Sequence, residues 1–278
     1  MTDTSPHSRR AFVSATCAAA LLSLARPRPA RAQRRIHVAI YDARGVGADA
    51  LAAADRAIQS APDLRARHVS PEDVRAGALD DADVALFTGG RGSVQGRLLG
   101  ELGRERVRAR VAAGCGYVGI CAGSYMALQP PPRDPDEPAD DTEPHKLALV
   151  AGVHATADAW QRGIAPARLR PTDGSAIVEL HYANGPLIAP LPTPGLEPYV
   201  ALATYETDIA SPRHGTLPGQ MRGTDAIAAA RHGQGRLLLF SPNPTLDPAR
   251  DDLFLAALRW AASDDDEPPS FARVLLRS

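Results

Sequence analysis

The chain has 278 residues, of which 44% are hydrophobic and 23% charged, and its net charge is −1. This near-neutral balance argues against a nucleic-acid-binding protein, which usually carries a strongly basic patch. No apolar run approaches the ~20 residues of a membrane span, and three cysteines are too few for a disulfide scaffold or a structural zinc site. The composition is that of an ordinary globular protein with a sizeable core.

The first 32 residues predict an export signal. Arg9 and Arg10 precede a short apolar stretch over 11–25, and an Ala-Arg-Ala sequence ends at Ala32. A basic pair, a short apolar segment and an A-x-A cleavage pattern are typical of a bacterial secretory signal, and the paired arginines resemble the twin-arginine type. We therefore expect cleavage after Ala32 and a periplasmic or secreted protein that is not held in the membrane, because the apolar stretch is too short to span it.

Strands and helices are predicted to alternate over the first hundred residues after this signal. The expected strands cover 35–42, 67–69, 83–87 and 116–120, and the expected helices cover 50–59, 98–113 and 122–128. Such alternation is typical of a parallel, doubly wound sheet.

The second half is predicted to be richer in strands. Residues 130–146 are rich in proline and acid without apolar periodicity, which indicates a surface loop inserted into the domain. Strands are expected at 175–180, 199–205, 226–230 and 236–240, a terminal helix at 253–262, and an acidic tail at 263–278. The absence of a repeat or a convincing linker in the sequence favours one domain over 33–262.

The most informative segment is Gly119-Ile120-Cys121-Ala122-Gly123, which has the form G-x-nucleophile-x-G between a predicted strand and a predicted helix. This is the context of a nucleophile elbow. The turn would project Cys121 above the sheet, require small residues two positions either side, and aim the Ala122 N–H at an oxyanion. We expect the helix N-terminus to lower the thiol pKa. The alternative is a buried, inert cysteine between turn-forming glycines.

A second glycine loop supports a site at the same place. Gly89 and Gly90 end the neighbouring strand at 83–87. The carboxyl ends of parallel strands share one edge of the sheet, where ligands bind. The backbone amides of Gly89 and Gly90 are therefore expected to complete an oxyanion hole or ligand site beside Cys121.

These segments resemble the class I glutamine amidotransferase-like superfamily and, within it, the biotin-protein ligase N-terminal-like group. The resemblance rests on residues 38–42 with Gly45, on 87–90 with 119–123, and on the His-Tyr-Ala-Asn-Gly-Pro segment at 181–186. It covers most of residues 35–262 and implies an α/β fold, a flavodoxin-like three-layer α/β/α sandwich with a mostly parallel sheet.

Amidotransferases of this superfamily use a Cys-His-Glu triad, and the resemblance maps its cysteine onto Cys121. Their His and Glu lie in a Ser-Pro-His-Pro-Glu segment, whose match here is Ser-Pro-Asn-Pro-Thr at 241–245. Asn243 thus stands at the place of the histidine and Thr245 at that of the glutamate. Asparagine cannot act as a general base near neutral pH, and threonine cannot orient an imidazolium by charge. Hydrolysis of glutamine by the usual triad is therefore not expected.

Other partners for the cysteine remain open. Asp42 closes the first strand on the same edge and could hydrogen-bond the thiol, or it could only form the turn. His181 could reach the pocket or lie exposed at a strand end. Tyr182, Asn184 and Asn243 could bind a ligand, although turn structure explains Asn184 nearly as well. The histidines lack metal-ligand spacing, and neither a metal nor a cofactor is expected.

Two functions follow as hypotheses. The first is an exported ligand-binding protein that keeps the pocket but lacks the triad, with an unidentified small molecule as its partner. The second is a cysteine-dependent hydrolase or transferase acting on a small amide or ester through Cys121 with Asp42 or His181. Redox sensing by Cys121 is a third, weaker hypothesis. Biotin ligation is not expected, because it needs a further catalytic domain with a lysine, and the only lysine is Lys146, in the acidic insert.

Overall fold

The computed structural model describes residues 35–132, 145–155 and 161–275, and these described residues belong to one compact unit. The predicted export signal lies outside the described residues, as does most of the predicted insert at 130–146. No helix in the described ranges is both long and apolar enough to cross a membrane.

Five parallel strands form one half of the sheet, in the order β2-β1-β3-β4-β11. This is the 2-1-3-4-5 order of flavodoxin-like folds. The central strands are apolar runs because helices cover both of their faces. Their bounds are β1 (Ile36–Tyr41), β2 (Leu64–Val69), β3 (Val84–Phe87), β4 (Gly116–Ile120) and β11 (Gly235–Phe240).

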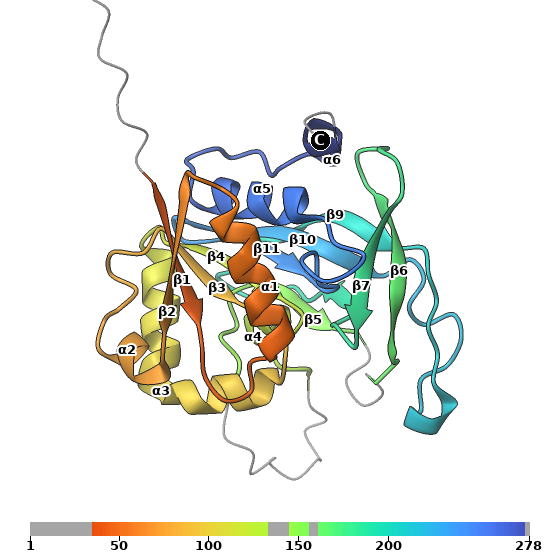
Figure 1. Ribbon diagram of the computed structural model, residues 1–278. Helices are drawn as coiled ribbons and strands as arrows, with labels where there is room; N and C mark the ends of the chain where they lie inside the picture. Colours follow the sequence, from red (N-terminus) through yellow and green to blue (C-terminus); the bar gives the residue numbers. More distant parts are fainter. Residues whose placement is uncertain (1–34, 133–144, 156–160, 276–278) are drawn as a thin grey trace, which may run out of the picture. The chain divides into compact units, whose positions relative to one another are not determined.

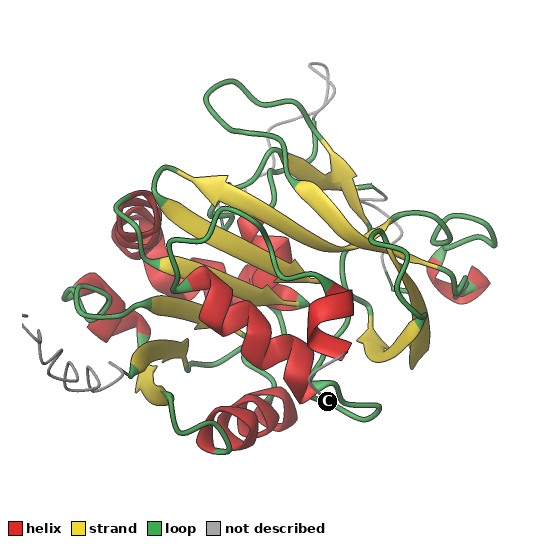
Figure 2. Ribbon diagram, turned by 90° about the horizontal axis from the view of Figure 1, so that it is seen from above, coloured by secondary structure: helices red, strands yellow, loops and turns green. Residues whose placement is uncertain are grey.

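Helices cover both faces of this half and make a three-layer arrangement (Figures 1 and 2). Because side chains alternate along a strand, Ile40 of β1 faces one apolar core and Tyr41 the other. The first core is closed by α1 (Ala48–Gln59) and α5 (Asp251–Ala261), and the second by α2 (Pro71–Arg75), α3 (Gly92–Ala112) and α4 (Ala122–Ala127).

The other half of the sheet is antiparallel, which corrects the expectation of a mostly parallel sheet. The chain continues outward from β11 in the order β10-β9-β6-β7, while β8 pairs with β10 and β5. The cause is the short connections: β10 returns into β11 through a turn at Gly233, and such a turn can join only antiparallel strands. The bounds are β5 (Gly152–His154), β6 (Ile164–Pro171), β7 (Val178–Ala183), β8 (Ile188–Pro190), β9 (Val200–Tyr205) and β10 (Asp225–His232).

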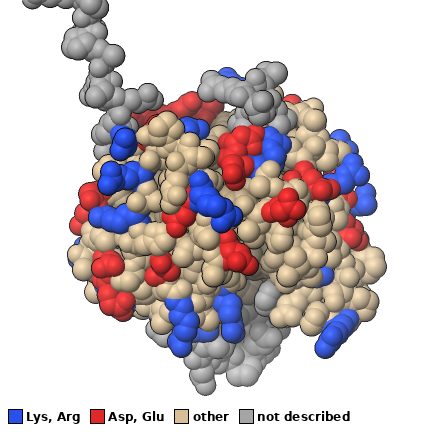
Figure 3. All heavy atoms as spheres, in the orientation of Figure 1, with Lys and Arg blue, Asp and Glu red and all other residues tan. Residues whose placement is uncertain are grey.

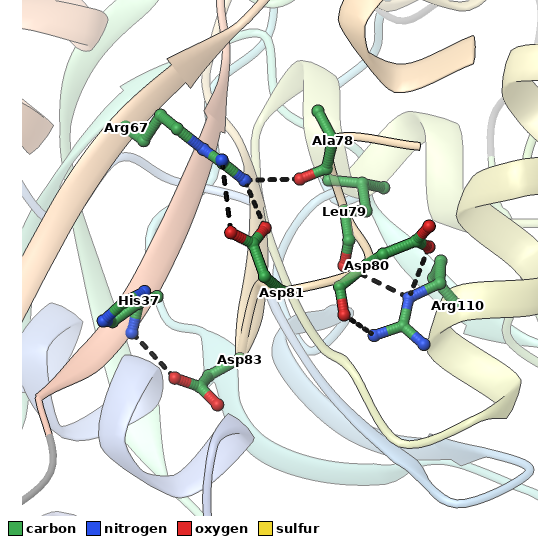
Figure 4. Close-up of polar contacts among 8 residues, drawn as sticks. All are labelled: His37, Arg67, Ala78, Leu79, Asp80, Asp81, Asp83 and Arg110. Carbon is green, nitrogen blue, oxygen red and sulfur yellow. Dashed lines mark hydrogen bonds and ion pairs between the residues drawn. The ribbon is translucent and has the colours of Figure 1, made fainter. Parts of the chain in front are cut away.

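Two arginines hold the connection that leads into β3 (Figure 4). Arg67 of β2 donates to the carboxylate of Asp81 at 2.6 Å, and Arg110 of α3 donates to the carbonyl of Leu79 at 3.1 Å. The connection is thereby tied both to the edge of the sheet and to a helix. This fixes the start of β3, and so the place where its far end delivers the glycine loop.

Part of the predicted acidic tail packs against the domain. Residues Phe271–Leu275 form α6, and Phe271 is only 4% exposed within the first core. The carboxylate of Asp173 accepts hydrogen bonds from the Ser270 hydroxyl at 2.8 Å and from the Ala272 backbone at 3.0 Å. One short 3-10 helix (Pro212–His214) lies in the loop after β9.

Candidate functional site

Cys121 occupies a sharp turn between β4 and α4. Its φ of 50° and ψ of −98° lie outside the regions that L-residues prefer. Its backbone N–H donates to the carbonyl of Phe240 on β11 at 2.8 Å, which anchors the turn to the neighbouring strand. The turn has the geometry expected from the sequence and leaves Cys121 only partly buried.

The glycines two positions either side of Cys121 are sterically required, as predicted. A Cβ at Gly123 would lie 2.1 Å from the carbonyl oxygen of Phe87, and one at Gly119 would lie 2.8 Å from the carbonyl carbon of Gly123. Real Cβ atoms do not approach other atoms so closely. The elbow therefore depends on bare backbone at both positions.

The glycine loop after β3 lies against Cys121. Gly90 has a φ of 135°, and a Cβ there would lie 2.1 Å from the carbonyl oxygen of Gly45. The carbonyl of Gly89 accepts from the N–H of Gly47 at 2.9 Å. A Cβ on Gly89 would lie 3.8 Å from the Cβ of Cys121. The two loops thus meet at one edge of the sheet, where the strand order places them.

Burial raises the pKa of the Cys121 thiol to about 11, although the backbone amides of Gly90 and Ala122 hydrogen-bond the sulfur and lower it. The expectation of a lowered thiol pKa is therefore wrong. Helix α4 has only six residues, and loss of hydration outweighs its few free amides. The thiol instead faces the carbonyl of Ala183 at 3.5 Å, a contact that suits a protonated S–H.

Asn243 and Thr245, which the sequence resemblance matches to a His and a Glu, are hydrogen-bonded to each other. The Oδ1 of Asn243 accepts from the backbone N–H of Thr245 at 2.8 Å and from its hydroxyl at 2.9 Å. The Nδ2 of Asn243 therefore points the other way. It lies 3.9 Å from the position that a Cβ on Gly89 would take, and that position is also 3.8 Å from the Cβ of Cys121. The amide nitrogen of Asn243 thus lies near the glycine loop that also contacts Cys121.

The carboxylate of Asp42 interacts with His68 and not with Cys121. Its carboxylate contacts Nδ1 of His68 at 3.0 Å, and Nε2 of His68 contacts Asp55 at 2.7 Å. The hydrogen bond to Asp42 raises the pKa of His68. Asp42 follows β1, two strands from β4 in the sheet. The structure thus brings Asp42 to His68 rather than to Cys121.

The segment at 181–186 contacts the elbow through its backbone, because the carbonyl of Ala183 faces the Cys121 thiol. His181 contacts the carbonyl of Asp247 through Nδ1 at 3.0 Å. Tyr182 is 0% exposed, and its hydroxyl donates to the carbonyl of Gly185 at 3.0 Å. Asn184 has a φ of 56°, and its Oδ1 accepts from the N–H of Gly163 at 2.6 Å. The described hydrogen bonds of these three side chains are thus with the protein's own backbone, and the ring of Tyr182 also packs edge-on against Tyr205.

Sequence reasoning missed a polar cluster around Tyr125, one helical turn after Cys121. The Tyr125 hydroxyl donates to the carbonyl of Asn184 at 3.3 Å, and His154 packs edge-on at 5.1 Å between ring centroids. The ammonium of Lys146, the chain's only lysine, donates to the Tyr125 carbonyl at 2.6 Å and lies 5.3 Å from its ring centroid. Burial lowers the pKa of Lys146 to about 8. The i, i+4 spacing from Cys121 could have pointed to Tyr125.

Two hollows in the described part of the chain lie away from Cys121. One is a small hollow of about 10 Å³ lined by apolar side chains that include Leu238 and Phe271. The other is a shallow surface hollow beside Arg67 and Asp81. Among the described residues no group of three or more His, Cys, Asp or Glu is arranged to hold a metal ion. Basic and acidic side chains are intermingled over the face drawn in Figure 3.

No protein-family model matches the chain, and a search of curated proteins finds no match. Among solved structures, the chain is similar to PurLQS from Thermotoga maritima, with a TM-score of 0.50 and 14% identity over 76% of this chain and 88% of that one. A cytoplasmic protein from Salmonella typhimurium gives a TM-score of 0.51 and 11% identity over 81% and 98%. A ThuA-like protein from Parabacteroides merdae gives 0.50 and 11% over 83% and 90%. These likenesses show a class I glutamine amidotransferase-like fold.

Proposed function

We propose that this chain is an exported protein of the biotin-protein ligase N-terminal-like group that binds a small ligand at Cys121 without classical glutaminase activity. The fold supports the superfamily, and the segments at 87–90, 119–123 and 181–186 support the group. The observation that carries the proposal is the Asn243–Thr245 pair: Oδ1 of Asn243 accepts from the backbone N–H and the hydroxyl of Thr245, and a carboxamide cannot act as the general base that the triad needs.

The chemistry of the thiol supports the same conclusion. A nucleophilic cysteine needs its thiolate, which is generated by an adjacent base or by a lowered pKa. Burial keeps Cys121 protonated, and the contacts of Asp42 and His181 lead elsewhere. No described contact therefore supports a hydrolase in which Asp42 or His181 assists Cys121.

We expect the mature protein to release no more ammonia from L-glutamine than its Cys121→Ser variant does. Removing the base from a catalytic unit of this kind typically lowers the rate by several powers of ten. Ammonia release measured on both proteins, at matched concentration, checks this. Turnover of glutamine, or of another small amide or ester, that disappears in Cys121→Ser would contradict the proposal and support the hydrolase.

Export is supported by the arginine pair, the short apolar stretch and the cleavage pattern that ends at Ala32. We expect the protein recovered from the periplasm of a bacterial host to begin at Gln33. N-terminal sequencing of that fraction is the measurement. A chain that stays in the cytoplasm with its first residues intact would contradict both the export and the cleavage site.

A further inference from the structure

His68 on β2 lies between two carboxylates that come from different elements. Its Nδ1 is 3.0 Å from Oδ2 of Asp42, which directly follows β1, and its Nε2 is 2.7 Å from Oδ2 of Asp55 on α1. An ionised carboxylate only accepts hydrogen bonds, and an imidazole donates from both nitrogens only when it is protonated. The geometry of this His68 cluster (Asp42, His68 and Asp55) therefore fits an imidazolium and not a neutral ring.

The Asp42 side of the cluster leads to the glycine loop beside Cys121. Asp42 begins the loop at 42–47, in which the carbonyl of Gly45 accepts from the N–H of Arg91 at 2.7 Å. The N–H of Gly47 in turn donates to the carbonyl of Gly89 at 2.9 Å. Both hydrogen bonds hold the loop at 42–47 against the glycine loop, so the contact between His68 and Asp42 fixes the start of a segment on which Gly89 and Gly90 rest.

The Asp55 side leads to the same place. Asp55 belongs to α1, whose first residue directly follows Gly47. A Cβ on Gly89 would lie 3.5 Å from the Cβ of Ala50 on α1 and 3.8 Å from that of Cys121. Because β2 is the edge strand of the sheet, His68 ties both the loop at 42–47 and α1 to that edge. One side chain thus connects the two elements that support the glycine loop.

The charge of His68 depends on pH near neutrality, where histidine titrates. The hydrogen bond to Asp42 raises the pKa of His68, burial lowers it by less, and the hydrogen bond to Asp55 raises it further. Among the described residues, these two acids are the titratable groups that act on His68. Because its folded pKa is raised, the stability that the cluster contributes is fully present below the unfolded pKa of about 6.5 and is lost as pH rises through the folded pKa.

A neutral His68 keeps a single N–H and can donate to only one of the two acids. The contact to Asp42 is the longer, and the Asp42 side chain is 43% exposed whereas that of Asp55 is 21% exposed. Water can therefore replace His68 more easily at Asp42. Deprotonation is expected to remove the proton from Nδ1, pass it to solvent, and release the Asp42 carboxylate, while Nε2–H stays with Asp55.

We propose that the His68 cluster is a proton-dependent fastening of the loop at 42–47, which holds the glycine loop beside Cys121 more firmly when His68 is protonated than when it is neutral. This inference rests on the proposed function and names a regulation of that same site. In the protonated state, β2, the loop and α1 are tied together. In the neutral state, the tie to the loop is lost and the tie to α1 remains.

Amide hydrogen exchange on the mature protein, followed by NMR, tests this fastening. The protection factor is the exchange rate of an unstructured peptide at the same pH divided by the measured rate. We expect the protection factors of the Gly47 and Arg91 amides to fall about threefold from about pH 5.5 to about pH 9, a small change because partly exposed ion pairs contribute little. The Thr172 amide, which donates to the carbonyl of Leu202 at 2.9 Å in the antiparallel half, should not change. Constant protection at Gly47 and Arg91, or an equal fall at Thr172, overturns the proposal.

Substitutions assign the pH dependence to the cluster. We expect His68→Gln and Asp42→Asn each to abolish the fall and to leave Gly47 at about pH 5.5 with the protection that the unsubstituted protein has at about pH 9. His214→Gln is the matched control, because His214 is an exposed histidine in the 3-10 helix at 212–214 and contributes no side chain to the cluster. A fall that persists in both His68→Gln and Asp42→Asn, or that disappears in His214→Gln, overturns the assignment.

A measurement on the unsubstituted protein stands if either variant fails to fold. We expect the ring nitrogens of His68, observed by NMR, both to carry protons at about pH 6 and to titrate with a midpoint above the value of about 6.5 for free histidine. A neutral ring at about pH 6, or a midpoint at or below that of free histidine, overturns the cluster. Failure here leaves a ligand-binding protein whose site does not respond to His68, whereas turnover lost in Cys121→Ser overturns the proposed function itself, so the two failures are distinguishable.

Discussion

The mature protein at pH 7.5 is expected to react with iodoacetamide at Cys121 about a hundred times more slowly than free cysteine does. Burial raises the thiol pKa to about 11, whereas a free cysteine has a pKa of about 8.5. Only the thiolate reacts. A pKa that is higher by about two units or more leaves correspondingly less thiolate at neutral pH. The amides of Gly90 and Ala122 lower the pKa but do not offset burial.

The rate should then rise about tenfold for each pH unit until pH approaches 11, because each unit multiplies the thiolate fraction by about ten below the pKa. The measurement is the alkylation rate of the Cys121 peptide, followed by mass spectrometry between pH 7 and the onset of unfolding. A plateau below pH 8, or a neutral-pH rate equal to that of free cysteine, would show an activated thiol and favour the hydrolase.

Cys115 supplies an internal control in the same sample. Burial raises the pKa of Cys115 to about 11 as well, but Cys115 is only 3% exposed, whereas Cys121 is partly exposed. Its thiolate fraction therefore matches that of Cys121, while its access to reagent is poorer. We expect Cys115 to be the slower of the two across the pH range. Cys121 reacting no faster than Cys115 would mean that the elbow is closed to solvent.

The parallel half of the fold and the elbow could be predicted because local rules govern them. The apolar runs at β3 and β4 signal strands covered on both faces, and the glycines at 119 and 123 follow from the contacts that a Cβ would make there. Helix α2 was missed because it has only five residues. Its capping box between Ser70 and Asp73 was nevertheless readable in the sequence.

The antiparallel half was less predictable. Strand β6 carries two arginines and two prolines, Pro166 and Pro171, which mask the alternation of its buried and exposed positions. Strands β5 and β8 have three residues each and owe their form to their pairing with each other. Patterns within one segment contain no information about such partners.

The candidate site shows the same division between local and distant causes. The backbone turn at Cys121 is local, but the burial that decides its pKa comes from residues far along the chain, such as Ala183 and Phe240. We expected Asp42 to contact the cysteine, but its carboxylate contacts His68, which lies 26 residues away on β2.

The double substitution Asn243→His with Thr245→Glu is expected to raise the alkylation rate of Cys121 at pH 7.5 by about a hundredfold. The frame for a base is already present, because the side chain at 245 reaches the side chain at 243 through a 2.9 Å hydrogen bond. The side chain at 243 also shares with Cys121 the space above Gly89. An imidazole there can take the thiol proton, and thiolates paired with imidazolium have pKa values well below that of free cysteine.

The added glutamate matters as much as the histidine. It accepts a hydrogen bond from the imidazole, fixes which ring nitrogen faces the sulfur, and stabilises the imidazolium that forms. We therefore expect Asn243→His alone to give a smaller increase. Asn243→Ala with Thr245→Val removes the donor pair without adding a base, and its alkylation rate should stay within a few-fold of the unsubstituted protein.

The pH profile distinguishes an activated thiolate from a site in which the substitutions only make Cys121 more accessible to the reagent. A thiolate–imidazolium pair gives a rate that is already high at pH 7 and nearly flat above it, whereas a loosened site raises the rate at every pH and keeps the tenfold slope. A double variant that folds, as judged by circular dichroism, yet retains the steep slope up to pH 11 would show that residues 243 and 245 do not face the sulfur. In that case the described geometry would no longer support the proposal that the chain lacks the triad's chemistry.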